Sequence, residues 1–177
     1  IGVRPPARNG QPAMTVTYHE SCHLSHGQKI VLQPRQLLKL IPNLTLVELP
    51  EASWCCGSAG IYNITQPEQS AKLLARKLEN IARTQAPAVA TSNPGCHLQL
   101  ASGLKNSLAA RCRTVTQPVS LLAEAYRKGG KPAEAEAALA GIADPSDSEV
   151  PWLLEKGLVY QELGKTGEAR TAFEKVQ

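Results

Sequence analysis

Two adjacent cysteines followed by a glycine, Cys55-Cys56-Gly57, are the residues of this chain best suited to chemistry. Neighbouring cysteines form only a strained disulfide, and they rarely chelate one small ion together. Both thiols can face one larger object if the chain turns sharply after them, which glycine permits because it has no Cβ. An iron–sulfur cluster is an object of that size, and cysteine thiolates are its usual ligands. The pair therefore predicts an iron–sulfur site that other cysteines complete.

Two further cysteines, Cys22 and Cys96, suit such a site, because they and the adjacent pair all follow predicted strands. These strands are residues 14–19, 44–49 and 87–91. Strands that alternate with helices indicate an α/β fold with a small parallel sheet flanked by helices. Loops that follow parallel strands emerge at one edge of the sheet, where open α/β folds bind ligands. We therefore expect a [4Fe-4S] cluster bound by four thiols: Cys22, Cys55, Cys56 and Cys96.

The helices that must position these loops are predicted from apolar spacing and from proline. They are residues 29–40, 67–84 and 96–108. Pro34 is interpreted as a break or a start within the first, and Pro67 begins the second. Cys96 lies at the start of the third, where the helix dipole favours a nearby anion. A fourth strand is predicted at 113–116, before a helix that Pro118 begins.

Two other interpretations of the four cysteines stay open: buried structural thiols, or a zinc site. Zinc sites commonly use CxxC knuckles. The sequence contains none, so an iron–sulfur cluster is favoured. The fifth cysteine, Cys112, lies outside the motif and is interpreted as a core or surface thiol.

Polar residues near the cysteines have two interpretations each. A histidine near Cys22 could ligate iron or donate a hydrogen bond to a cluster sulfur, but a bond to local backbone is the simpler role. The histidines concerned are His19, His23 and His26. Ser58 and Tyr62 either donate hydrogen bonds to the cluster or stabilise their loop. Asn93-Pro94-Gly95 is interpreted as a turn that presents Cys96.

Four stretches carry a family resemblance: CHLSHGQK, CCGSAGIYN, NPGCHLQLASGL and QPVSLLAEAYR. Over about residues 14–127, the chain resembles the cysteine-rich CCG domain of heterodisulfide reductase and related proteins. It is most similar to the C-terminal CCG half of the glycolate oxidase (glycolate dehydrogenase) iron-sulfur subunit. The resemblance implies an iron-sulfur electron-transfer subunit of a glycolate or 2-hydroxy-acid dehydrogenase. A flavin-containing subunit would take electrons from the substrate, and this chain would pass them to an acceptor.

One position departs from the heterodisulfide reductase pattern. That pattern ends in CxxC, and its last cysteine corresponds here to Gln99. The resemblance to heterodisulfide reductase implies a non-cubane cluster held by five cysteines, whereas four thiols fit an ordinary cubane. A lactate-utilisation or heterodisulfide-reductase-type redox subunit is the alternative function. The sequence has no Ser/His/Asp set, phosphate loop or GxGxxG, so we expect hydride chemistry in another subunit and predict no catalytic residue here.

Residues 120–177 change character, because they are rich in Ala, Glu and Leu and are predicted to be helical throughout. A repeat with a spacing of 34 residues gives the pairs Tyr126–Tyr160, Gly130–Gly164 and Leu139–Phe173. Its period is that of tetratricopeptide (TPR) repeats, with Ala123 and Gly157 where paired helices approach closely. The predicted helices are residues 119–128, 132–142, 149–163 and 166–177. A third function is therefore a TPR scaffold for a protein partner, in which the cysteines form a structural metal or thiol site.

The sequence thus predicts three segments. Residues 1–13 are a linker from an upstream domain that this sequence lacks, 14–118 are the CCG domain, and 119–177 are two TPR-like repeats. The charge supports a change near residue 117. Residues 1–116 contain twelve Lys or Arg and five Asp or Glu, whereas the remaining residues contain seven and ten.

Composition bears on which kinds of partner the chain binds and on where in the cell it is located. The basic part has few aromatics and no Lys/Arg run, so we expect no nucleic-acid partner. Its basic residues either face an electron-transfer partner or are solvated: Lys29, Arg35 and Lys39. No stretch reaches the roughly 18–20 apolar residues of a membrane helix, so no transmembrane segment is expected. Cysteines that bind metal suit a reducing compartment. We expect a cytoplasmic location, free or peripheral on the inner face of the membrane.

Overall fold

The computed structural model describes residues 5–6, 13–107, 111–140 and 150–175. Its contacts divide the chain into two compact units. The sheet unit comprises Met14–Arg35 and Thr45–Thr116. The helical unit comprises Gln36–Leu44, Gln117–Gln177 and the segment before Met14. The predicted linker at 1–13 lies almost wholly outside the described residues.

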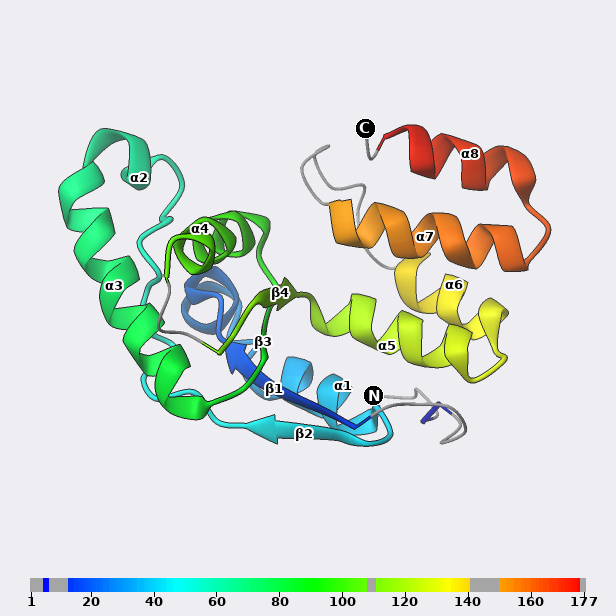
Figure 1. Ribbon diagram of the computed structural model, residues 1–177, viewed down its shortest axis with the longest axis horizontal. Coiled ribbons are helices and arrows are strands. Elements are labelled where there is room, and N and C mark those ends of the chain that lie inside the picture. The colour runs from blue at the N-terminus through cyan, green and yellow to red at the C-terminus, as the bar shows by residue number, and fades with distance from the viewer. Residues whose placement is uncertain (1–4, 7–12, 108–110, 141–149, 176–177) are drawn as a thin grey trace. The chain divides into compact units, whose positions relative to one another are not determined.

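Four strands form one sheet in the order β2-β1-β3-β4 (Figure 1). Their bounds are β1 Met14–His19, β2 Leu44–Val47, β3 Ala88–Thr91 and β4 Thr114–Thr116. The strand β3 pairs in parallel with both β1 and β4, and its register places His19 opposite Thr91 at the carboxyl ends. All of β3 is buried, as is usual for a central strand of a parallel sheet. The predicted α/β fold with a small parallel sheet is confirmed.

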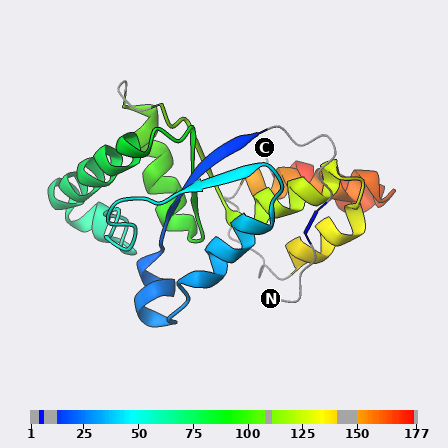
Figure 2. The same cartoon turned by 90° about the horizontal axis from the view of Figure 1, so that it is seen from below.

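Two helices, α3 (Pro67–Thr84) and α4 (Pro94–Lys105), pack on each other and help to cover the sheet. Figure 2 shows both helices, in green, on the same side of the blue strand β1. Their apolar side chains meet β3 and β4 in a buried core that includes Ile81, Val89, Leu100 and Val115. Because Cys56 and Cys96 belong to the same core, its packing helps to fix the positions of these two thiols.

The local structure differs from the prediction at two short segments. His23–Gly27 (η1) is a π-helical turn directly after Cys22, and Tyr62–Thr65 (α2) is one turn of α-helix before α3. Neither is long enough to show the apolar periodicity that marks a helix in sequence. The helix predicted at 29–40 is α1, Leu32–Leu40, and Pro34 lies in its first turn, where a missing N–H costs little.

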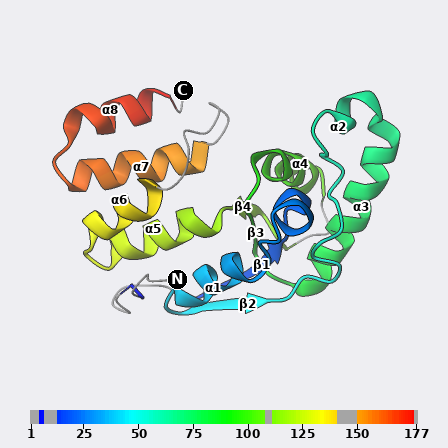
Figure 3. The ribbon, with the colours of Figure 1, turned by 180° about the vertical axis from the view of Figure 1, so that it is seen from behind.

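The rest of the described chain is helical, as predicted. The helices are α5 Pro118–Lys128, α6 Pro132–Ala140, α7 Val150–Glu162 and α8 Thr166–Glu174. They pack as two hairpins, α5 with α6 and α7 with α8, and α7 also contacts α5 and α6 (Figure 3). The end predicted for the second helix falls at residues 141–142, outside the described residues. No helix in the described part of the chain has both the length and the apolar character to span a membrane.

The two hairpins repeat the same backbone contacts 34 residues apart. Gly130 and Gly164 both have φ of +72°. After each glycine, the next amide donates to a tyrosine carbonyl at 2.9 Å: Lys131 to Tyr126 and Lys165 to Tyr160. The sequence repeat is therefore also a repeat of backbone conformation, and its assignment to the TPR class stays a prediction.

Candidate metal centre

The four cysteines of the predicted site lie in one row at the carboxyl edge of the sheet. Cys22 interacts with Cys55, Cys55 with Cys56, and Cys56 with Cys96. Cys56 and Cys96 are buried, whereas Cys22 and Cys55 are partly exposed. All five cysteines of the chain are described, and none forms a disulfide. Three loops that follow different strands thus bring four free thiols together.

The turn after the adjacent pair depends on Gly57. Its φ is +92°, a conformation that residues with a Cβ rarely adopt. A Cβ here would also lie 2.5 Å from the backbone oxygen of Ser70. The Ser70 hydroxyl donates to the Gly57 carbonyl at 2.9 Å, and the Gly57 amide donates to Cys55 Sγ at 3.3 Å. The turn is therefore attached to α3 and already presents an N–H group to one sulfur.

The other end of the same loop is attached to α3 through Glu51. The Glu51 carboxylate pairs with Arg76 and accepts a hydrogen bond from Asn80 at 2.8 Å. These contacts hold the pKa of Glu51 down to about 2, with Arg76 as the largest cause. Arg76 also lies 4.4 Å from the centre of the Trp54 ring. The loop that carries the cysteine pair is thus held on α3 on both sides of the pair.

Cys96 is positioned by the start of α4. The Asn93 side chain caps this helix and accepts a hydrogen bond from the Cys96 amide at 3.1 Å. Pro94 is the first helical residue, a position that suits its fixed φ. The predicted turn Asn93-Pro94-Gly95 is therefore the cap and first turn of the helix, and Cys96 lies near the positive end of the helix dipole.

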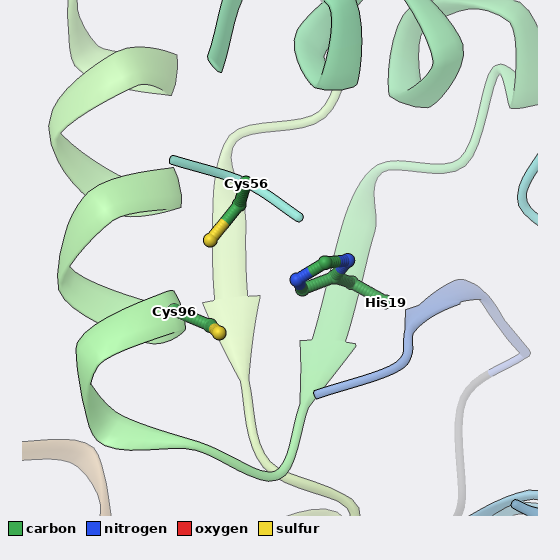
Figure 4. Close-up of side chains that lie close together, drawn as sticks. All are labelled: His19, Cys56 and Cys96. Atoms are coloured by element: carbon green, nitrogen blue, oxygen red, sulfur yellow. The ribbon is translucent and has the colours of Figure 1, made fainter. Parts of the chain in front are cut away.

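His19, the last residue of β1, joins the two buried thiols. A ring nitrogen of His19 and the Sγ atoms of Cys56 and Cys96 all lie within 4.8 Å of one another. The three side chains point toward one another in Figure 4. His19 is 1% exposed, and neither ring nitrogen has a hydrogen-bond partner among the described residues. Burial and then the charge of Lys77 lower its pKa to about 3, and an interaction with the Ala52 backbone, outside ordinary hydrogen-bond geometry, only partly offsets them.

The protein by itself does not favour thiolates at this site. The contact with Cys55 lowers the pKa of Cys56, but Cys96 and burial together raise it by more, to about 12. The contact with Cys56, and then burial, raise the pKa of Cys55 above its ordinary range. Burial, and then the charge of Cys55, raise the pKa of Cys22. Thiols this close oppose one another's ionisation, so a bound metal cation is what would hold them all as thiolates.

Lys77 on α3 is a charged residue of the site that the sequence interpretation missed. It is 0% exposed, and Nζ donates to the Glu51 carbonyl at 2.5 Å. Among the described residues, no carboxylate forms an ion pair with it. Burial lowers its pKa, and the largest opposing effect comes from Cys56, ahead of Glu51 and Cys55. A buried ammonium is costly without an anion, and the nearby thiols are where such an anion would form.

Gln99, at the position of the absent fifth cysteine, supports the loop instead of the thiols. Its amide nitrogen donates to Ser70 Oγ at 3.0 Å, and its amide oxygen accepts from Asn63 at 3.3 Å. Because Ser70 in turn donates to the Gly57 carbonyl, Gln99 connects α4 to the turn after the cysteine pair. A partner 29 residues away in sequence gave no local signal for this role.

The remaining predicted residues take varied places. His23 and His26 are exposed, so the structure does not bring them to the buried thiols. Ser58 is buried, with Oγ beside Gly95, and Tyr62 is partly exposed on α2. Cys112 is buried in the core, and its thiol contacts the Thr114 carbonyl at 3.7 Å.

Of the three basic residues predicted to face a partner or solvent, two are exposed and one is held in ion pairs. Lys29 and Lys39 are exposed, whereas Arg35 pairs with Glu20 at 2.7 Å and Glu48 at 3.0 Å. Arg35 therefore serves the fold of the sheet unit.

Comparison with known proteins gives matches over the same residues. Residues 16–101 match the cysteine-rich domain family, CCG. The chain is 43% identical over 114 residues to a probable glycolate oxidase iron-sulfur subunit of Bacillus subtilis, covering 64% of this chain and 26% of that protein. It is 40% identical over 92 residues to a fumarate reductase (CoM/CoB) subunit of Methanothermobacter marburgensis, covering 52% and 19%.

A third relative is lactate utilization protein A of Oceanobacillus iheyensis, which is 30% identical over 90 residues, or 51% of this chain and 37% of that protein. The chain thus spans well under half the length of each of these relatives. No solved structure matches it.

Proposed function

Residues 16–101 belong to the cysteine-rich CCG domain family, and on that premise we propose that the chain is an iron–sulfur electron-transfer subunit. Its [4Fe-4S] cluster is bound by four thiolates: Cys22, Cys55, Cys56 and Cys96. When bound, such a cluster accepts and donates single electrons. The observation that carries the proposal is the row of four neighbouring thiols from three loops.

The chemistry of the donor set fits an anionic, thiolate-ligated centre. The Gly57 amide already donates to Cys55 Sγ, and N–H bonds to sulfur stabilise ligated thiolates. Lys77 supplies a buried positive charge that has no carboxylate partner among the described residues. His19 presents a ring whose nitrogens have no partner there either. All three groups would have a favourable partner if the thiols carried negative charge.

The exposure of the cysteines suggests where electrons pass. Cys56 and Cys96 are buried in the core, which excludes water from that side of the site. Cys22 and Cys55 are partly exposed and form the other end of the row. Electrons therefore enter and leave at the side of Cys22 and Cys55, where a redox partner can come closest.

The relatives support a role in 2-hydroxy-acid oxidation, because one is named as a glycolate oxidase iron-sulfur subunit. In this proposal a flavin-containing dehydrogenase subunit oxidises glycolate or a similar acid and passes electrons to this chain. The lactate utilization relative supports lactate as the alternative substrate. The complex would be cytoplasmic, free or peripheral on the inner membrane face, and the helical unit would offer a TPR-like surface to a protein partner.

The test is the iron and acid-labile sulfide content of anaerobically purified 177-residue chain, with EPR of its reduced form. We expect about four irons and four sulfides per chain, the content of a [4Fe-4S] cluster. Replacing any one of the four cysteines by Ser should lower both contents and change the EPR signal. Cys112→Ala, a matched change at a buried thiol outside the row, should leave both unchanged. Folded protein that holds neither iron nor sulfide after anaerobic reconstitution would refute the proposal.

A mononuclear metal site, such as zinc, is a second candidate, because His19, Cys56 and Cys96 present three ligand atoms within 4.8 Å of one another. Zinc is usually held by four protein ligands of these types. This candidate predicts one metal ion per chain and no sulfide. It also predicts that Cys22→Ser retains the metal, because Cys22 is not one of these three residues.

A further inference from the structure

His19 is the polar side chain of the site whose hydrogen-bonding capacity is unused. It is 1% exposed, and both ring nitrogens lack a partner among the described residues. A buried polar group without a partner costs about 1–3 kcal/mol. One nitrogen interacts with the Ala52 backbone outside ordinary hydrogen-bond geometry, so at least the other calls for a partner that is bound in the working protein.

The position of the ring identifies the kind of partner. One of its nitrogens lies within 4.8 Å of both Cys56 Sγ and Cys96 Sγ, and Figure 4 shows the ring directed toward these sulfurs. Because His19 ends β1 and pairs in register with Thr91 of β3, the sheet holds its backbone at the edge where the thiols converge. Because Cys56 and Cys96 would be ligands, the ring lies beside the sulfurs of the centre that they would hold.

We propose that His19 donates a ring N–H hydrogen bond to a sulfur of the metal centre beside Cys56 and Cys96, and thereby raises its reduction potential. The inference rests on the proposed iron–sulfur function and deepens it. The four thiols would supply all the protein ligands that a [4Fe-4S] cluster usually takes, so the imidazole would act on sulfur and not on iron. Hydrogen bonds to the sulfurs favour the more negative, reduced state of a cluster. His19 is in this sense a positioning residue that tunes the centre.

The test compares the reduction potentials of the 177-residue chain and three variants, measured by EPR-monitored redox titration under anaerobic conditions. In His19→Leu the donor is lost, so we expect unchanged iron and sulfide content and a potential more negative than that of the wild type. His19→Asn and His19→Gln each place an amide N–H near one of the two ring positions. At least one of them should return the potential toward the wild-type value, and the one that does identifies the donating nitrogen.

A second measurement separates hydrogen bonding from ligation. Pulsed EPR of protein labelled with 15N-histidine should show a weak nitrogen coupling that disappears in His19→Leu. A strong coupling, together with loss of iron in His19→Leu, would overturn the inference in favour of a ligand role. Equal potentials in wild type and His19→Leu would also overturn it, while leaving the iron–sulfur proposal intact. Wild-type protein without iron and sulfide would remove both.

Discussion

Lys77 in the sheet unit and Glu155 in the helical unit are both buried charged side chains, and their partners differ. In the helical unit, Glu155 is 8% exposed and pairs with Arg127 at 2.8 Å. In the sheet unit, Lys77 is 0% exposed and donates to one backbone carbonyl. The groups that favour the Lys77 charge are led by Cys56. Glu155 is thus neutralised within its unit, as Glu20 is by Arg35 in the sheet unit, whereas Lys77 is a cation whose natural partner is negative charge on the thiols.

Glycines with positive φ also differ between the two units. In the helical unit, Gly130 and Gly164 have the same positive φ, and a Cβ on either would meet nothing within 4 Å. In the sheet unit, Gly57 combines a positive φ with close contact to Ser70. Gly130 and Gly164 thus end helices, whereas Gly57 brings a cysteine loop against a helix. The sheet unit therefore accepts local crowding and buried polar groups where its site is built, which is common at functional sites.

The largest expected effect is that of Gly57→Ala. It tests whether a turn in which glycine is crowded tolerates a Cβ less well than a turn in which glycine is uncrowded. The new Cβ would have an unfavourable φ and would overlap Ser70, so we expect the free energy of unfolding to fall by about 3 kcal/mol. The thiols of Cys55 and Cys56 should also be displaced, so iron content should fall. Chemical denaturation and iron analysis measure the two effects.

Gly60→Ala is the matched control for this change. Gly60 lies in the same loop with φ of +67°, but a Cβ there would meet nothing within 4 Å. Only the cost of a positive φ for a residue with a Cβ remains, so we expect the free energy of unfolding to fall by about 1 kcal/mol. Iron content should stay unchanged. Equal losses for the two alanine variants would contradict the role assigned to the contact with Ser70.

The second effect compares the two buried charges directly, in protein freed of metal by a chelator. Arg127→Met leaves Glu155 buried without its cation, so the free energy of unfolding should fall by about 2 kcal/mol, less than for a fully buried pair because some exposure remains. Lys77→Met removes a cation that has no carboxylate partner among the described residues, so the metal-free chain should lose no stability or gain about 1 kcal/mol. Denaturation followed by circular dichroism measures both.

Two further variants make this comparison decisive. The double variant Arg127→Met with Glu155→Leu should recover most of the lost stability, because no buried charge is left unpaired. Arg170→Met breaks an exposed pair with Glu174 and should cost less than about 0.5 kcal/mol. If Lys77→Met destabilised the metal-free chain as much as Arg127→Met, the thiols would not be needed to explain the buried ammonium.

Much of the fold could be predicted, because its elements are long or have sharp boundaries. The helix predicted at 67–84 is found at Pro67–Thr84, where a proline start and apolar spacing coincide. The strand predicted at 14–19 is found at Met14–His19. The π-helical turn at His23–Gly27 could not be predicted, because five residues carry no periodic signal.

The meeting of the thiols could also be expected, because parallel strands send their following loops to one edge of the sheet. Their supporting groups were missed, because long-range contacts decide them. Gln99 acts through Ser70, which is 29 residues away in sequence. Lys77 did leave a signal, because it follows Leu74 by three residues and precedes Ile81 by four on the face that α3 turns inward. Lysine is ordinarily expected to be solvated, so this spacing alone does not predict that Lys77 is buried.

The smallest expected effect concerns the helical unit alone and tests whether its two hairpins are equivalent in packing as well as in backbone. Gly157 on α7 faces Phe173 on α8, and a Cβ at Gly157 would overlap the Phe173 ring, with Cε1 as the nearest atom. The corresponding positions of the first hairpin hold Ala123 and Leu139, both buried, so there an alanine occurs together with the smaller leucine. We therefore expect Gly157→Ala to lower the free energy of unfolding by about 1 kcal/mol, because the overlap outweighs the better helix propensity of alanine.

In a Phe173→Leu background the overlap is relieved and only the propensity term remains. There Gly157→Ala should raise the free energy of unfolding by about 0.5–1 kcal/mol. The effect of the substitution on stability therefore changes sign when Phe173 is replaced. A double-mutant cycle by chemical denaturation measures this coupling. Equal effects in the two backgrounds would mean that the 34-residue repeat is one of backbone conformation only, without the matched close packing that Ala123 and Gly157 suggest.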